Sequence, residues 1–156
     1  MNKWRVLRWL VVICACLFVL AQFSRPARTN PVVDQSLALE SRIEVSPPVS
    51  AIIDRSCSDC HSNKTRWPWY SNVAPVSWFV IGHVNEGRQN LNFSEWGRYT
   101  KRETDGLLKQ ICQEVKAEAM PLSSYTPLHP GSTLSDEDKK ILCDWASAAS
   151  QRPNAQ

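Results

Sequence analysis

Residues 55–71 of the chain read RSCSDCHSNKTRWPWYS. Two cysteines, Cys57 and Cys60, stand three positions apart, and His61 follows directly after the second. Three chemistries use a Cys-x-x-Cys pair: thiol–disulfide exchange, zinc binding and covalent attachment of haem. The residues around the pair decide among these three chemistries. The fold class depends on the same choice, because a redox pair belongs to an α/β domain.

Two of the three chemistries fit the sequence poorly. Redox-active cysteines lie at a helix N-terminus in a thioredoxin-like α/β domain, whereas strand signals in this sequence are weak. Zinc needs four ligands, and Cys57, Cys60 and His61 supply three, two of them adjacent. Haem uses every residue of the motif, because two thiols bond its vinyl groups and the imidazole binds its iron. The motif predicts one covalent haem c, and a non-catalytic zinc-binding or accessory domain stays open as an alternative.

The N-terminal residues predict a membrane segment. A basic end at residues 1–8 precedes an apolar run at residues 9–23, which would form about 22 Å of helix. Counted from Val6 the helix reaches about 27 Å, close to the roughly 30 Å of the hydrocarbon layer. A cleavable signal peptide has the same layout. The stretch QFSRP at residues 22–26 favours an anchor that stays attached.

The distribution of charge indicates orientation and partner class. Five of the 18 basic residues lie within the first 28 residues, so the rest of the chain carries 13 basic against 15 acidic residues. Basic residues before the apolar run outnumber those just after it, which predicts a cytoplasmic N-terminus, a single pass through the inner membrane and a periplasmic domain. A nucleic-acid-binding protein would show a basic patch. That class is excluded, and redox proteins and the membrane are the expected partners.

The rest of the chain predicts one all-α domain. Residues 24–48 contain four of the ten prolines and are interpreted as a tether, residues 49–150 as the domain, and residues 151–156 as a tail. Helices are expected where apolar residues recur at spacings of three and four. The expected helices cover residues 49–60, 74–91, 104–120 and 135–150, with long loops at 61–74, 92–103 and 121–134.

Caps and apolar faces define these helices further. Ser50 is a possible cap of the first helix, Pro75 suits a first turn, Pro121 is expected to stop the third helix, and Ser135 with Asp138 forms a capping-box pattern. The residues expected to be buried are Ile52 and Ile53; Val76, Phe79, Val80, His83 and Val84; Leu107, Leu108, Ile111, Cys112 and Val115; and Ile141, Leu142, Trp145 and Ala148.

Three segments in this order resemble one known family. They are CSDCHSNKTRWPWYS, APVSWFVIGHVNEGRQNLNFSEW and MPLSSYTPLHPGSTLSDEDKKILCDW, and together they look like the bacterial haem-binding domain family of small exported single-haem proteins, over about residues 50–146. The last segment also resembles class I cytochromes c, where Met-Pro precedes a Ser-capped C-terminal helix. The resemblance implies a cytochrome c-like domain of about four helices around one haem, with Met120 as the second axial ligand.

Other residues are candidates around the haem. His83 and His129 are alternatives to Met120, and a vacant sixth position is a further one. Trp67, Trp69 and Tyr70 are expected against the porphyrin because aromatic rings bury large apolar areas. Partners for the propionates are sought among Arg66, Arg88, Trp96, Arg98 and Tyr99.

Two further cysteines and the overall function complete the expectations. Cys112 and Cys143 form an even pair in an oxidising compartment and predict a disulfide, with two buried free thiols as the alternative. The leading hypothesis is a membrane-anchored periplasmic mono-haem c-type cytochrome that carries single electrons and is not an enzyme. The alternative is a haem enzyme or gas sensor with an open sixth position.

Overall fold

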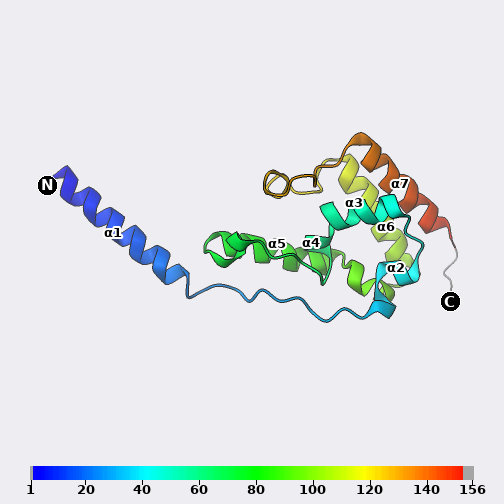
Figure 1. The fold of residues 1–156 in the computed structure, drawn as a ribbon, viewed down its shortest axis with the longest axis horizontal. Helices are drawn as coiled ribbons and strands as arrows, with labels where there is room; N and C mark the ends of the chain where they lie inside the picture. Colours follow the sequence, from blue (N-terminus) through cyan, green and yellow to red (C-terminus); the bar gives the residue numbers. More distant parts are fainter. Residues whose placement is uncertain (1, 153–156) are drawn as a thin grey trace.

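Two long helices, α6 (Lys101–Lys116) and α7 (Asp136–Gln151), pack side by side at one end of the molecule (Figure 1). The computed structural model describes residues 2–152. Each helix starts at a capping box, formed by Thr100 with Glu103 and by Ser135 with Asp138. A capping box satisfies backbone N–H groups that the first turn leaves unpaired. The predicted start of the last helix is therefore confirmed.

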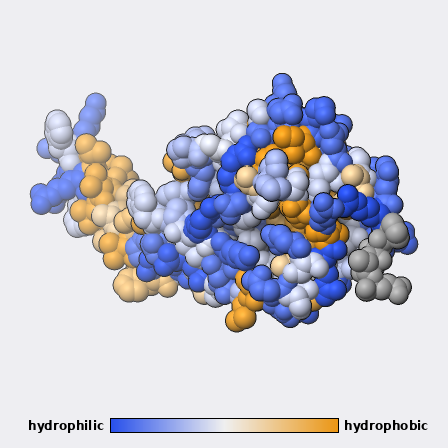
Figure 2. All heavy atoms as spheres, turned by 45° about the vertical axis from the view of Figure 1, so that its right-hand side comes forward, coloured by the Kyte–Doolittle hydropathy of each residue, from blue (hydrophilic) through white to orange (hydrophobic). Residues whose placement is uncertain are grey.

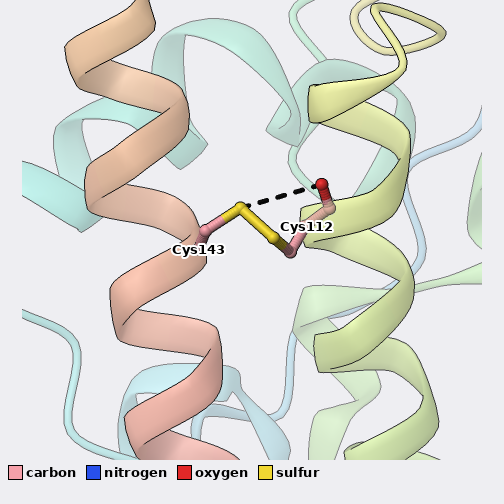
Figure 3. Close-up of a disulfide and its surroundings, with 2 residues drawn as sticks. All are labelled: Cys112 and Cys143. Carbon is pink, nitrogen blue, oxygen red and sulfur yellow. Dashed lines mark hydrogen bonds between the residues drawn. A yellow bond between two sulfur atoms is a disulfide. The ribbon is translucent and has the colours of Figure 1, made fainter.

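A disulfide ties the same two helices together. Cys112 of α6 and Cys143 of α7 face one another across the helix interface (Figure 3), and their Cα atoms lie 4.8 Å apart. The bond encloses the whole α6–α7 connection, which contains Met120 and the short helix η4 (Thr126–Leu128).

The core lies where α3 (Pro47–Ser56) packs against α7 and where α2 (Leu39–Arg42) packs against η3 (Phe93–Arg98). Leu39 and Leu142 are no more than 1% exposed. Burying such side chains is the main favourable contribution to folding. The other buried apolar residues of this cluster are Val49, Ile52, Ile53, Leu91, Phe93, Trp96, Leu108, Val115, Leu134, Cys143 and Ala146.

A second group of elements extends from this core. It consists of α4 (Ser58–His61), η2 (Trp69–Asn72) and α5 (Val76–Asn90), and α5 packs against both of the others. No strand occurs among residues 2–152, so the predicted all-α fold class is confirmed for the described part of the chain.

The N-terminal helix α1 (Lys3–Ala21) projects from the domain, and no residue of it is buried (Figure 1). It is long and apolar enough to cross a membrane or to serve as a signal sequence. In Figure 2 it carries a large orange, hydrophobic surface beside a domain that is mostly blue. After α1 the chain runs extended to η1 (Gln35–Leu37) and α2, so the segment expected as a tether includes two short helices. Residues 153–156 of the expected tail lie outside the described residues.

Helix bounds differ from expectation at several places. The first expected helix, residues 49–60, is divided at Cys57 into α3 and α4, and α6 begins at Lys101, before the expected residue 104. Helix α3 begins at Pro47, so Ser50 lies inside the helix and Ser46 occupies the cap position. Prolines suit the first turn because their missing N–H would be unpaired there in any case. Helix α6 ends at Lys116, before Pro121, and Glu118 adopts a left-handed φ of 56°. A left-handed residue ends a helix by turning the chain back on the last turn.

The buried face of α5 also differs. Ser77, Ile81, Val84 and Gly87 are its buried residues, whereas Phe79 of the expected face is 67% exposed. Val76 is exposed as well, and Val80 and His83 are half-buried. Val84 is buried as expected, and Gly87 belongs to the buried face because α5 approaches Cys60 of α4 closely there. In α7 the expected Ala148 is likewise exposed, and Ala146 is buried in its place.

Candidate functional site

The Cys-x-x-Cys-His motif forms a single helical turn. Cys57 is both the C-cap of α3 and the N-cap of α4. The backbone N–H groups of Cys60 and His61 both donate to the Cys57 carbonyl, at 3.2 and 2.9 Å. Residues three and four apart share a face of a helix. The turn therefore presents both thiols and the imidazole to the same side.

The orientation of His61 is fixed by the backbone of α5. Its Nδ1–H donates to the carbonyls of Gly87 and Leu91, at 3.0 and 3.1 Å. Because both partners are acceptors, Nδ1 carries the proton and Nε2 keeps its lone pair. Burial lowers the pKa of His61 despite the opposing effect of these two hydrogen bonds. A neutral imidazole held through its second nitrogen is the form in which histidine binds a metal.

Helix α5 approaches the motif so closely that only glycine fits at position 87. A Cβ atom there would lie 2.7 Å from the carbonyl oxygen of Cys60. The close approach brings the Gly87 carbonyl within reach of His61. The glycine thereby positions the imidazole.

The two thiols are free and weakly acidic. Burial raises the pKa of Cys57 to about 12 and that of Cys60 to about 11. Thiol–disulfide exchange and zinc binding both use the thiolate, which these surroundings disfavour at neutral pH. Among residues 2–152, no group of three His, Cys, Asp or Glu side chains has the arrangement of a metal site. The side-chain geometry therefore gives the zinc alternative no support.

A cavity of about 370 Å³ opens beside the motif. Its size is within the roughly 300–1,000 Å³ of small-molecule sites. Cys57, Cys60 and His61 all line it. Most of the remaining lining is apolar and comes from α3, η3, α6, α7 and the loop between α6 and α7, whereas α5 contributes His83, Glu86, Gly87 and Asn90. On the face of the domain shown in Figure 2, orange, hydrophobic surface gathers between blue side chains. The apolar lining residues are Ile53, Leu91, Phe93, Leu107, Ile111, Val115, Met120, Pro121, Leu122, Leu134, Leu142 and Trp145.

Comparison with known proteins identifies the family of the chain. A family model described as a haem-binding domain matches residues 16–148. The chain belongs to the haem-binding domain family. No curated protein and no solved structure shows significant similarity to the chain. The family resemblance of the sequence is thus confirmed, and the cofactor of the protein is haem.

The residues of the haem-binding domain fit this cofactor. A porphyrin is a flat apolar ring with an iron that accepts nitrogen or sulfur ligands. The cavity offers an apolar lining, one imidazole with a free Nε2 and two thiols. Met120 and His83 also line the cavity. Two of the three predicted candidates for the sixth position therefore reach the same space, and the third, His129, does not line it.

Other predicted site residues lie outside the lining of the haem cavity. Trp67 donates its indole N–H to Asn30, and Trp69 is 77% exposed. Tyr70 donates to His129, which stacks on Tyr125 at a ring distance of 3.7 Å. The structure does not bring these four side chains to the cavity: Trp67, Trp69 and Tyr70 belong to the segment between α4 and α5, which contacts Asn30, and His129 follows η4.

The five candidates for the haem propionates also have other partners. Arg66 donates to Asp59, and Arg88 donates to the carbonyls of Ser62 and Thr29. Arg98 pairs with Glu95, and the Tyr99 hydroxyl accepts from the backbone N–H of Asn92. Trp96 is buried in the core and stacks on Phe93.

One contact of the site was not expected from the sequence. The Tyr125 hydroxyl donates to Asp59 at 2.8 Å, and Arg66 donates to the other oxygen of the same carboxylate through its backbone N–H and its Nε–H, both at 3.0 Å. Burial and the Asp59 carboxylate raise the pKa of Tyr125, which keeps the hydroxyl a donor. Asp59 stands between the two cysteines, and Tyr125 lines the cavity. The pair therefore joins the haem motif to the loop that carries Met120.

Proposed function

We propose that this protein is a membrane-anchored, periplasmic mono-haem cytochrome of the c type that carries single electrons. One observation carries the proposal: a single turn, α4, presents two thiols and a carbonyl-held imidazole to one apolar cavity. Haem iron supplies one-electron redox chemistry. The protein residues hold the group, set its ligands and exclude water from it.

Cys57 and Cys60 would hold the haem as thioethers. The addition of a thiol across a vinyl group breaks one S–H bond, forms one C–S bond and places the hydrogen on the neighbouring carbon, so no oxidant is needed. Both cysteines are free, so each has a sulfur available for this addition. His61 would bind the iron through Nε2.

Met120 is the favoured sixth ligand because it does not belong to α5, the helix that holds His61 in place. The imidazole is held by Gly87 of α5, and His83 stands one turn earlier on that same helix. Met120 lies in the α6–α7 loop, which Tyr125 fastens to the motif. A His/Met pair raises the reduction potential and suits electron transfer.

The membrane anchor and the compartment are supported by the N-terminal part of the chain. Helix α1 has 19 residues, about 28 Å of helix. Lys3, Arg5 and Arg8 lie in its first two turns, whereas only Arg25 and Arg28 follow its end closely, which favours a cytoplasmic N-terminus and a periplasmic haem domain. A disulfide such as Cys112–Cys143 is typical of that oxidising compartment.

The proposal is tested by the mass and colour of the denatured protein. The full chain is expressed in cells that mature c-type cytochromes, denatured and extracted with acidified acetone. We expect the haem to remain on the wild-type chain and to be extracted from the Cys57→Ser/Cys60→Ser double variant. A colourless wild-type chain with the mass of the bare polypeptide would contradict covalent attachment. A red chain with a high-spin spectrum that changes with carbon monoxide at neutral pH would instead favour an enzyme or sensor.

A further inference from the structure

Five large apolar side chains are exposed around the junction between α1 and the haem domain. We call them the tip patch: Phe23, Trp69, Val76, Trp78 and Phe79. Phe23 follows α1, Trp69 belongs to η2, and the other three belong to the first turns of α5. Phe23 is 85% exposed. Exposed apolar side chains gathered in one region mark an interaction surface.

Hydrogen bonds fasten the tip patch to the end of α1. The side-chain amide of Gln22 donates to the Ala74 carbonyl at 3.1 Å and accepts from the Ala74 N–H at 3.0 Å. The Trp78 indole N–H donates to the Ser24 carbonyl at 2.9 Å. Figure 1 shows the start of α5 beside the end of α1. A membrane that α1 spans would therefore have its surface at the level of the tip patch.

The charges around the tip patch suit a phospholipid surface. No acidic residue occurs between Asp59 and Glu86. Arg25 donates to the Asn72 carbonyl and Arg28 to the Ser71 hydroxyl, so two cations of the linker lie beside η2. Tryptophan prefers the membrane–water interface, because its ring is apolar and its N–H is polar. Cations attract the phosphates of lipid head groups.

We propose that the tip patch inserts into the interface of the lipid bilayer that α1 spans and thereby fixes the orientation of the haem domain. This inference rests on the proposed retention of α1 as an anchor. The tip patch would contact the lipids of the leaflet in which α1 ends, because the patch is continuous with the end of α1 and its surroundings are cationic.

The test uses the full-length holo-protein in nanodiscs that contain a phosphatidylcholine with a diazirine near the head-group end of an acyl chain. After illumination and proteolysis, mass spectrometry locates the lipid adducts. We expect adducts on α1 and on the peptide that covers residues 69–79. The peptide around Leu128 is the internal control, since Leu128 is 60% exposed but lies on η4.

Matched variants separate lipid contact from folding. Trp69→Ser/Phe79→Ser changes two exposed side chains of the tip patch, and Leu128→Ser changes an exposed apolar side chain elsewhere. The wild type and both variants are expected to keep their haem and to show the same haem spectrum. Adducts at residues 69–79 are expected to be lost only in the double variant. Linear dichroism of the haem in oriented bilayers is expected to decrease in the same variant.

The other outcomes distinguish failure of the lipid contact of the tip patch from failure of α1 as a retained anchor. Adducts on α1 without adducts at residues 69–79 would overturn the tip patch and leave the anchor standing. An intact mass that lacks the α1 residues would overturn the anchor itself. Adducts on α1 alone, together with a dimer that the double variant dissociates, would assign the tip patch to a second copy of the chain and overturn the lipid contact.

Discussion

At the scale of single residues, Gly87 determines how the haem-binding turn meets α5. Its missing side chain lets the two backbones approach, and its carbonyl receives the Nδ1–H of His61. Gly82 lies on the same helix, and a Cβ there would meet nothing within 4 Å. The two glycines therefore form a natural pair of test and control.

Alanine is expected to have opposite effects at the two positions. Gly87→Ala should lower the free energy of unfolding of the holo-protein by about 1–3 kcal/mol, because a 2.7 Å contact forces the helices apart. Gly82→Ala should raise it by about 0.5–1 kcal/mol, because alanine favours the helix. Denaturant unfolding followed at the haem absorbance measures both. Equal effects at the two sites would contradict the close approach.

Met120 is expected to determine the spin state of the iron. Met120→Ala should abolish the weak long-wavelength band of a sulfur–iron bond, shift the oxidised spectrum toward high spin and lower the reduction potential. His83→Ala should leave the band in place. Visible spectra and potentiometry of the purified oxidised and reduced proteins measure these changes. If His83→Ala alone changes the spin state, the histidine is the ligand.

At the scale of helices, the start of α7 depends on an ionised Asp138. Burial acts to raise the pKa of Asp138, but hydrogen bonds from the Ser135 backbone and from Arg55 outweigh burial and lower it below 3.8. A carboxyl group with a lowered pKa stabilises the fold above the pKa it has when unfolded. This contribution is lost as the pH falls through the folded pKa.

Asp138→Asn should therefore destabilise the protein at pH 7 by about 1 kcal/mol, the typical effect of a helix cap. The difference between wild type and variant should shrink as the pH falls below 3.8. Asp144→Asn is the control, because its exposed carboxylate pairs only with Lys140 among the described residues. Thermal unfolding between pH 7 and pH 3 measures the difference. A difference that is constant over this range would contradict the role of the carboxylate.

The disulfide between α6 and α7 should contribute on the order of 3–4 kcal/mol, because it closes a loop of about 31 residues in the unfolded chain. Cys112→Ser/Cys143→Ser should lower the free energy of unfolding by this amount. A thiol reductant should have the same effect on the wild type and none on the variant. Two titratable thiols at these positions before reduction would show that the bond is absent.

Sequence patterns predicted those elements whose cause is local. The box of Ser135 and Asp138 sets the start of α7 through contacts within one turn. The motif at residues 57–61 is likewise local: its two thiols and its imidazole lie within five consecutive residues, and the structure places all three at one cavity. The disulfide pairing required only that two cysteines lie on buried helix faces.

Features that depend on long-range packing were not predicted. The buried face of α5 is set by the approach of Gly87 to Cys60, which no periodicity reveals. The contact of Tyr125 with Asp59 joins residues 66 positions apart. Helix α2 has four residues, too short for a recognisable pattern, and it carries the buried Leu39 against η3, which lies more than 50 positions later in the chain.

At the scale of the whole molecule, the path from α1 to the core is held along the domain. Arg88 donates to the Thr29 carbonyl and to the side chain of Asn30, and the Asn30 amide donates to the Thr65 carbonyl. Together with the contacts of Gln22 and Trp78, these bonds attach residues 22–30 to α5 and to the loop after α4.

Because residues 22–30 are attached to the domain, the haem domain has little freedom to move relative to α1. A domain on a flexible linker could move between a donor on one side of its anchor and an acceptor on the other, and a longer linker would extend the distance it covers. If the protein carries electrons from a membrane anchor, as proposed, its donor and its acceptor would both have to reach the haem at one fixed position. The rate of electron transfer would then depend on how often these partners arrive and not on the length of residues 22–30.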